Sequence, residues 1–84
     1  MLKILYFAWL RERTGRAEEE ILLPEGVASV ADLMGWLRAR DTAHATAFAN
    51  PRLVRAAVNQ VFAGPETALA AGDEVAFFPP VTGG

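Results

Sequence analysis

The sequence predicts a small α+β domain in which one main helix packs on one face of a mixed sheet of about four to five strands. Short segments rich in strand-forming residues recur between turn residues, and one segment shows a firm helical spacing of apolar residues. The chain has 84 residues, of which 52% are hydrophobic. That size allows one core and one domain, which we expect at 1–80, followed by a short flexible tail.

The first strand is predicted at 2–7. Its alternation places Leu2, Ile4 and Tyr6 on one face and Phe7 on the other. Both faces of this strand therefore carry apolar residues.

A helical turn is predicted at 8–14 and a second strand at 17–23. Gly15 lies between them and suits the positive φ that ends a helix. The strand carries Glu18, Glu19 and Glu20 in a row. Because neighbouring strand residues point to opposite faces, these carboxylates do not converge on one cation. We interpret them as a solvated stretch that resists aggregation, and we expect no metal site.

The main helix is predicted to begin at Val30. Ser29 precedes it and offers a side-chain oxygen to the free amides of the first turn. Val30, Leu33, Met34 and Leu37 stand at helical spacing and form one apolar stripe. This stripe indicates packing against a sheet.

The segment 41–51 carries a weak pattern. It is Ala-rich, and both a helical turn and a loop ended by Asn50-Pro51 fit it. His44 lies in this segment with Asp41 as its acidic neighbour at helical spacing. We expect His44 to be a surface side chain without a catalytic role.

Two further strands are predicted at 53–59 and 74–78. Gly64-Pro65 breaks the chain after the first, and Gly72-Asp73 turns into the second. The order strand, turn, strand, helix, strand, strand contains one long helix, which must cover one face of the sheet. The β-grasp fold is the small architecture that fits this order.

The composition argues against several classes of function. Eight Lys and Arg stand against ten Asp and Glu, without a basic run, so nucleic acid is not an expected partner. The longest apolar run, 4–10, is too short to span a membrane, and we expect a cytoplasmic protein. One His, one Ser and no Cys argue against a catalytic triad, a metal cluster or a bound cofactor.

The chain end is its most unusual feature. Pro79-Pro80 stops the last strand and forms a stiff spacer, and Gly83-Gly84 makes a tip without Cβ atoms. The five residues from Pro80 onward reach about 16 Å at roughly 3.3 Å each. Such a tail can deliver its carboxylate into another protein's active site. A carboxylate resists nucleophiles until it carries a leaving group such as AMP, so we expect activation by an adenylating partner.

The residues resemble the small subunit of molybdopterin synthase, a ubiquitin-like β-grasp family, over nearly the whole chain. The strongest match is 72–84 (Gly-Asp-Glu-Val-Ala-Phe-Phe-Pro-Pro-Val-Thr-Gly-Gly). Ala56 to Gln60 supports it, as do Phe7-Ala8 and Leu10-Arg11-Glu12.

The resemblance implies a sulfur carrier without catalytic side chains of its own, working in a heterotetrameric synthase. Gly84 would be adenylated by an enzyme similar to ubiquitin-activating enzymes, through a transient acyl-AMP formed with ATP. It would then become a thiocarboxylate, with a sulfurtransferase as the sulfur source. The tail, including Val81, Thr82 and Gly83, would enter a large catalytic subunit. There the sulfur would convert cyclic pyranopterin monophosphate into the dithiolene of molybdopterin.

Four side chains are candidates for the partner interface, together with Pro79, Pro80, Val81 and Thr82. Phe7 and Phe78 lie on the sheet face opposite the core residues, and Phe62 is expected to join them in an exposed apolar docking patch. The alternative is a second small cluster inside the domain. Arg11 either contacts an acid of the partner or solvates its turn.

Other functions fit the same ending. A sulfur carrier for thiazole, cysteine or tRNA thiolation would keep the fold and Gly83-Gly84 and change the partner. A protein modifier attached to lysines through Gly84, or an interaction domain with an idle tail, belongs to another class.

Overall fold

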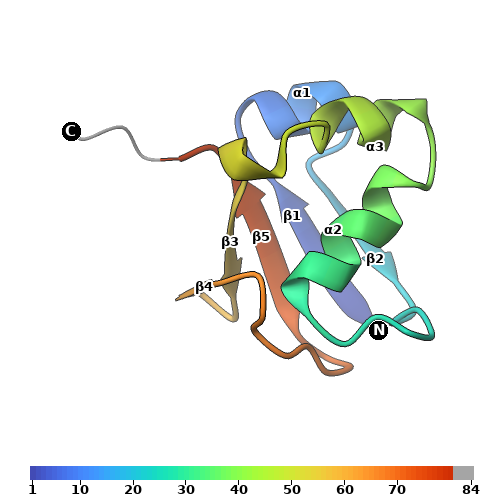
Figure 1. The fold of residues 1–84 in the computed structure, drawn as a ribbon, viewed down its shortest axis with the longest axis vertical. Helices are drawn as coiled ribbons and strands as arrows, with labels where there is room; N and C mark the ends of the chain where they lie inside the picture. The colour runs from blue at the N-terminus through green and yellow to red at the C-terminus, as the bar shows by residue number, and fades with distance from the viewer. Residues whose placement is uncertain (81–84) are drawn as a thin grey trace.

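Within residues 1–80, which the computed structural model describes, five strands form one mixed sheet (Figure 1). The strands are β1 (Leu2–Tyr6), β2 (Glu18–Ile21), β3 (Arg55–Val58), β4 (Val61–Ala63) and β5 (Glu74–Phe78). They lie in the order β2-β1-β5-β3-β4. β1 and β5 are parallel, and the other neighbours are antiparallel. The predicted α+β class with a mixed sheet is therefore confirmed.

Helices connect these strands on one side of the sheet. They are α1 (Trp9–Thr14), α2 (Val30–Arg38), α3 (Thr42–Ala47) and the short 3-10 helix η1 (Pro51–Leu53). Figure 1 shows α2 in front of the sheet, with α1 and α3 together at the end where β1 and β5 finish. The longest of them, α2, is the predicted main helix.

The core lies between the sheet and the helices, around the central strand β5. Phe77 of β5 is opposite Tyr6 on one neighbouring strand and opposite Ala56 on the other. Phe48, just after α3, packs its ring edge-on against Phe77, with the ring centroids 5.0 Å apart. All four residues are buried. The aromatic rings therefore join α3 to the middle of the sheet.

Two residues that were predicted to mark helix ends, Ser29 and Gly15, do so in the structure. The Ser29 hydroxyl accepts a hydrogen bond from the Asp32 amide at 3.2 Å, which caps α2. Val30, Leu33 and Leu37 are fully packed in the core, and Met34 is partly buried against it. Gly15 ends α1 with φ 79°.

β4 was not located from the sequence. It forms a hairpin with β3 through Asn59 and Gln60, whose φ angles are 51° and 70°. Two positive φ values are typical of the tight type I′ turn, which usually carries glycine at its second position. Here the Asn59 side chain supports the turn instead: it donates to the Asp73 carboxylate and accepts from the Glu74 amide. β2 and β3 are also shorter than the predicted 17–23 and 53–59.

The segment 41–51 contains a short helix followed by the start of η1. Asp41 caps α3 by accepting a hydrogen bond from the His44 amide at 2.8 Å. The predicted surface position of His44 is wrong, because its side chain is 1% exposed. α3 points that side chain toward the sheet, where its ring nitrogens lie within hydrogen-bond distance of Asp41 and Glu19.

Candidate docking surface and chain end

The outer face of β5 leads directly to the chain end. Residues along β5 alternate, with Val75 and Phe77 in the core and Phe78 half-buried on the other face. Arg55 of β3 is opposite Phe78. The predicted assignment of Phe77 to the core face and Phe78 to the outer face is therefore confirmed.

Phe78 forms an aromatic pair with Phe62 from the edge strand β4. Their ring centroids lie 5.8 Å apart, and the Phe62 side chain is 79% exposed. Phe7 follows β1 directly and is also exposed. We call Phe7, Phe62 and Phe78 the aromatic patch. A pair whose outer ring is 79% exposed and whose inner ring is half-buried does not complete an internal cluster, so the alternative of a second small core does not fit the structure.

The tail begins immediately after this patch. Pro79 and Pro80 follow Phe78 without an intervening residue and are half-buried. Val81, Thr82, Gly83 and Gly84 lie outside the described residues, and their predicted roles stay predictions. A protein that holds Phe78 would thereby fix the point from which the tail starts.

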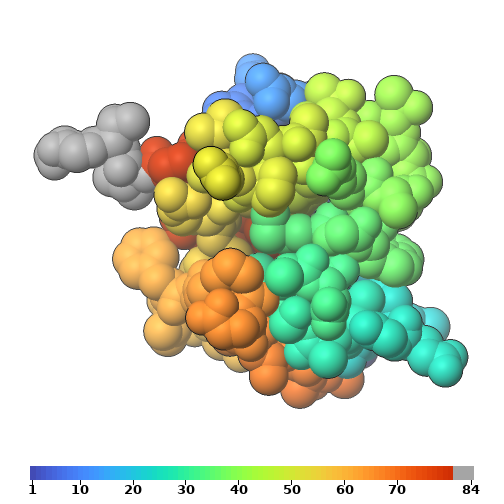
Figure 2. Space-filling view, viewed as in Figure 1, coloured from blue at the N-terminus to red at the C-terminus, as the bar shows by residue number. Residues whose placement is uncertain are grey.

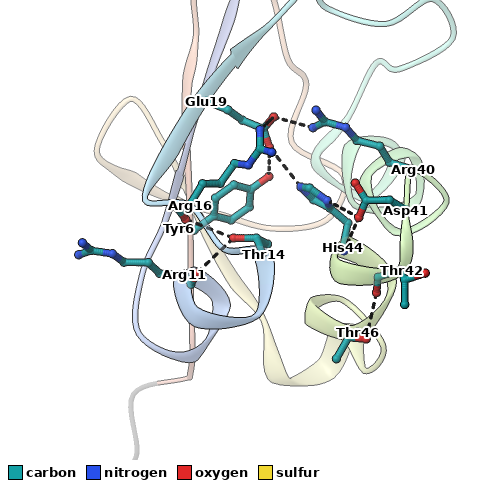
Figure 3. A network of polar contacts seen from close by, with 10 residues as sticks. All are labelled: Tyr6, Arg11, Thr14, Arg16, Glu19, Arg40, Asp41, Thr42, His44 and Thr46. Carbon is teal, nitrogen blue, oxygen red and sulfur yellow. Dashed lines mark hydrogen bonds and ion pairs between the residues drawn. The ribbon is translucent and has the colours of Figure 1, made fainter.

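Arg11 is exposed on α1 and stands apart from the buried polar groups. Figure 3 shows its side chain pointing away from them. Its backbone carbonyl accepts hydrogen bonds from the Gly15 amide and, at 3.5 Å, from the Thr14 hydroxyl. The predicted contact with a partner stays a prediction.

A buried polar network that was not predicted joins α3 to β1 and β2 (Figure 3). The Tyr6 hydroxyl donates to Glu19 Oε2 at 2.7 Å, and His44 Nε2 lies 3.2 Å from the same oxygen. His44 Nδ1 lies 2.8 Å from Asp41 Oδ1. Arg40 donates to Glu19 Oε1. The interpretation of Glu19 as solvated is wrong, because its side chain is only 6% exposed.

Hydrogen bonds within the network stabilise the ionised form of Glu19 and the neutral form of Tyr6. Burial raises the pKa of Glu19, but hydrogen bonds from Tyr6, Arg40 and His44 outweigh it and lower the pKa overall. Burial and the bond to Glu19 raise the pKa of Tyr6. Carboxylate oxygens only accept, so His44 donates to both Asp41 and Glu19 when both ring nitrogens carry protons. The network therefore ties α3 to the sheet electrostatically.

Two sequence signals could have located this network. Glu19 is opposite Ile4 in the β1–β2 pair, so strand parity puts it on the core side. Asp41 and His44 stand three residues apart, as in a capped first turn.

Among residues 1–80, His, Cys, Asp and Glu side chains form no group that could hold a metal ion. In the same residues, no helix is long and apolar enough to cross a membrane.

The five-stranded mixed sheet with its main helix on one face defines a ubiquitin-like β-grasp protein. The chain belongs to the ThiS family, whose model matches residues 4–84. It is 40% identical over 84 residues to the molybdopterin synthase sulfur carrier subunit of Escherichia coli strain K12, with both chains covered completely.

Two solved structures show the same architecture. The first is a putative molybdopterin converting factor, subunit 1, from Pyrococcus furiosus, with a TM-score of 0.77 and 36% identity, covering 95% of this chain and 97% of that one. The second is SAMP1 from Haloferax volcanii, with a TM-score of 0.72 and 30% identity, covering 99% and 98%. Both likenesses extend over nearly the whole chain.

Proposed function

We propose that the chain is the sulfur-carrier subunit of molybdopterin synthase, and that its C-terminal Gly84 carries the sulfur. The full-length similarity to a curated carrier subunit is the observation that supports this most. The family match extends to residue 84, so it includes Gly83-Gly84.

The chemistry begins at the Gly84 carboxylate, which is ionised at neutral pH with a reference pKa of about 3.5. An adenylating partner joins this carboxylate to the α-phosphate of ATP, and pyrophosphate leaves. The terminal sulfur of a sulfurtransferase persulfide then attacks the acyl carbon, and AMP leaves. A thiol outside this chain reduces the resulting acyl disulfide, which frees the sulfur on Gly84 and leaves a disulfide on the sulfurtransferase side. The product is a thiocarboxylate, so the carrier holds sulfur without a cysteine.

The aromatic patch would position this tail in the large catalytic subunit. Exposed aromatic side chains are typical anchors of protein interfaces. Phe78, half-buried at the base of the tail, would be such an anchor, and its exposed partner ring Phe62 would enlarge the apolar surface. The thiocarboxylate would donate its sulfur to cyclic pyranopterin monophosphate, and catalytic side chains would come from the large subunit.

Reconstitution tests this proposal. The thiocarboxylated carrier is mixed with a molybdopterin synthase large subunit and cyclic pyranopterin monophosphate, and molybdopterin is measured by its fluorescent oxidation product. We expect product in proportion to the thiocarboxylate added, and none from the untreated carrier. A thiocarboxylated carrier that binds the large subunit and yields no product would reject the proposal.

A second candidate is a protein modifier conjugated to lysines through Gly84. One relative of the fold, 27% identical over 95% of this chain, is the small archaeal modifier protein 1 of H. volcanii. Blotting of cell extracts for the tagged chain separates the two functions. A modifier gives a ladder of conjugates that is lost when Gly84 is deleted, whereas a dedicated carrier gives the free protein alone.

A further inference from the structure

A groove on the helix side of the molecule lies between α2 and the β3–β4 hairpin. Figure 2 shows it as a hollow between α2, in green, and the yellow and orange segments of η1, β3 and β4. Its volume is about 580 Å³. Met34, Phe48, Val54 and Ala56 contribute apolar surface to its lining. This volume lies within the roughly 300–1,000 Å³ that is usual for small-molecule sites.

Three arginines surround this apolar floor. They are Arg38 of α2, Arg52 of η1 and Arg55 of β3, and they make up three of the eight basic residues of a chain with net charge −2. The lining contributed by residues 1–80 includes no Asp or Glu. Within that range, the ion pairs formed by basic side chains involve Lys3, Arg16, Arg40 and His44 rather than these three. We call this feature the arginine groove.

The arginine groove also contains a glycine that packing does not require. Gly35 lies inside α2, where alanine would stabilise the helix more than glycine does. A Cβ added at Gly35 would meet no atom within 4 Å. The effect of glycine here is to leave the groove open above the helix backbone.

The groove continues around the β4 edge toward the aromatic patch. Arg55, Ala56, Ala63 and Gly64 line it and also line a second hollow of about 400 Å³. Phe62 and Phe78 complete that second hollow. A ligand seated in the groove can therefore extend to the patch without leaving the surface.

We propose that the arginine groove is a second docking site, which takes an acidic peptide segment of a partner protein. An apolar side chain of the segment fills the floor, and its carboxylates pair with Arg38, Arg52 and Arg55. Guanidinium groups bind carboxylates by strong, charge-assisted hydrogen bonds. Three cations from three separate elements match several carboxylates spread along a chain better than one anionic head group. The continuity with the second hollow also favours an extended ligand.

A titration followed by NMR tests the proposal on the full, ¹⁵N-labelled chain. The probe is a capped hexapeptide, Glu-Glu-Leu-Glu-Glu-Leu, and the control is the same peptide with Gln for Glu. We expect amide shifts from the acidic peptide alone, confined to α2, η1 and the β3–β4 hairpin. The double variant Arg38→Gln/Arg52→Gln should bind at least about tenfold more weakly, since two charge-assisted bonds are lost.

Two further variants separate the site from general charge and fold effects. Gly35→Leu should block the groove and abolish the shifts while melting no lower than the parent chain, because a Cβ at this position meets no atom within 4 Å and leucine favours a helix more than glycine does. Arg13→Gln removes a cation on α1, which stacks over Trp9 and lies outside the groove, and should bind like the parent.

Several results would overturn the proposal: no shifts at millimolar peptide, equal binding of the Gln peptide, retained binding in Gly35→Leu, or equal loss in Arg13→Gln. Decanoate, which has one carboxylate on an apolar chain, serves as a probe for a small amphiphilic ligand. Amide shifts from decanoate but not from the acidic peptide would also overturn the proposal and would indicate such a ligand instead. The titration needs neither the thiocarboxylate nor the synthase. A carrier that makes molybdopterin and fails to bind the peptide therefore rejects the groove alone.

Discussion

Phe77→Ala and Phe78→Ala change neighbouring residues of β5, and we expect them to have opposite effects on folding and on docking. Phe77 is 0% exposed and packs against the rings of Phe48 and Tyr6. Truncating a buried Phe to Ala costs about 3–5 kcal/mol of unfolding free energy. For a domain of this size, each kcal/mol lowers the Tm by about 4–8 °C. The Tm of Phe77→Ala should therefore fall by at least about 12 °C.

Phe78 is half-buried and packs on Phe62, which is itself exposed. An aromatic pair of this kind contributes about 0.5–1.5 kcal/mol, so the Tm should fall by about 2–12 °C, less than for Phe77→Ala. As an interface anchor, Phe78 should contribute about 2 kcal/mol or more to binding, which is roughly a 30-fold rise in Kd. Calorimetric titration with the large subunit measures this change, and a thermal scan measures the Tm.

Phe62→Ala serves as a control within the aromatic patch, because its exposed ring contributes little to the fold. It removes the same ring pair, so it should lower the Tm no more than Phe78→Ala does, and it should weaken docking. Equal loss of stability in Phe77→Ala and Phe78→Ala would refute the assignment of the two faces of β5. Parent-like binding of the large subunit by Phe78→Ala would refute the role of Phe78 in docking.

Three further outcomes are expected. Deleting Gly84 should leave the Tm unchanged and abolish sulfur transfer; a sharply lower Tm would show that the tail supports the fold. Gly83→Ala should melt normally but slow both adenylation and sulfur release, since a methyl group would obstruct the narrow channel that we propose the tail enters; parent rates in both assays would contradict threading. The lowered pKa of Glu19 stabilises the fold above the unfolded pKa of about 4.3, and this contribution is lost as the pH falls through the lower folded pKa. Urea unfolding of Glu19→Gln should therefore depend less on pH in that acidic range than unfolding of the parent, and parallel pH profiles would exclude this role of Glu19.

Most of the fold was predicted from residues whose structural role depends only on their near neighbours in the sequence. Ser29 has a hydroxyl that caps a helix, and Gly15 takes a φ that other residues avoid, so each marked an element end correctly. Parity along β5 separated Phe77 from Phe78 because strand side chains alternate strictly.

Two of the missed features depend on contacts between distant segments, and the third is too short to give a clear signal. His44 is buried because it meets Glu19, 25 residues away; the spacing of Asp41 and His44 signals a helix cap but does not point to so distant a partner. β4 is only three residues long, and its turn lacks the usual glycine. The arginine groove likewise arises where α2, η1 and β3 meet, so spacing along the chain does not reveal it.

The mass of the intact chain tests the central claim most directly. The chain is co-expressed with an activating enzyme and a sulfurtransferase, purified and weighed, and replacement of one oxygen by sulfur adds about 16 Da. Oxidation of either of its two methionines adds a similar mass, so the sample is also treated with iodoacetamide. Because the chain has no cysteine, thiol-selective alkylation reports the thiocarboxylate. We predict the mass gain and one alkylation, both located at Gly84 and both lost when Gly84 is deleted. An unchanged mass, in a preparation where a known carrier gains sulfur, would contradict the account.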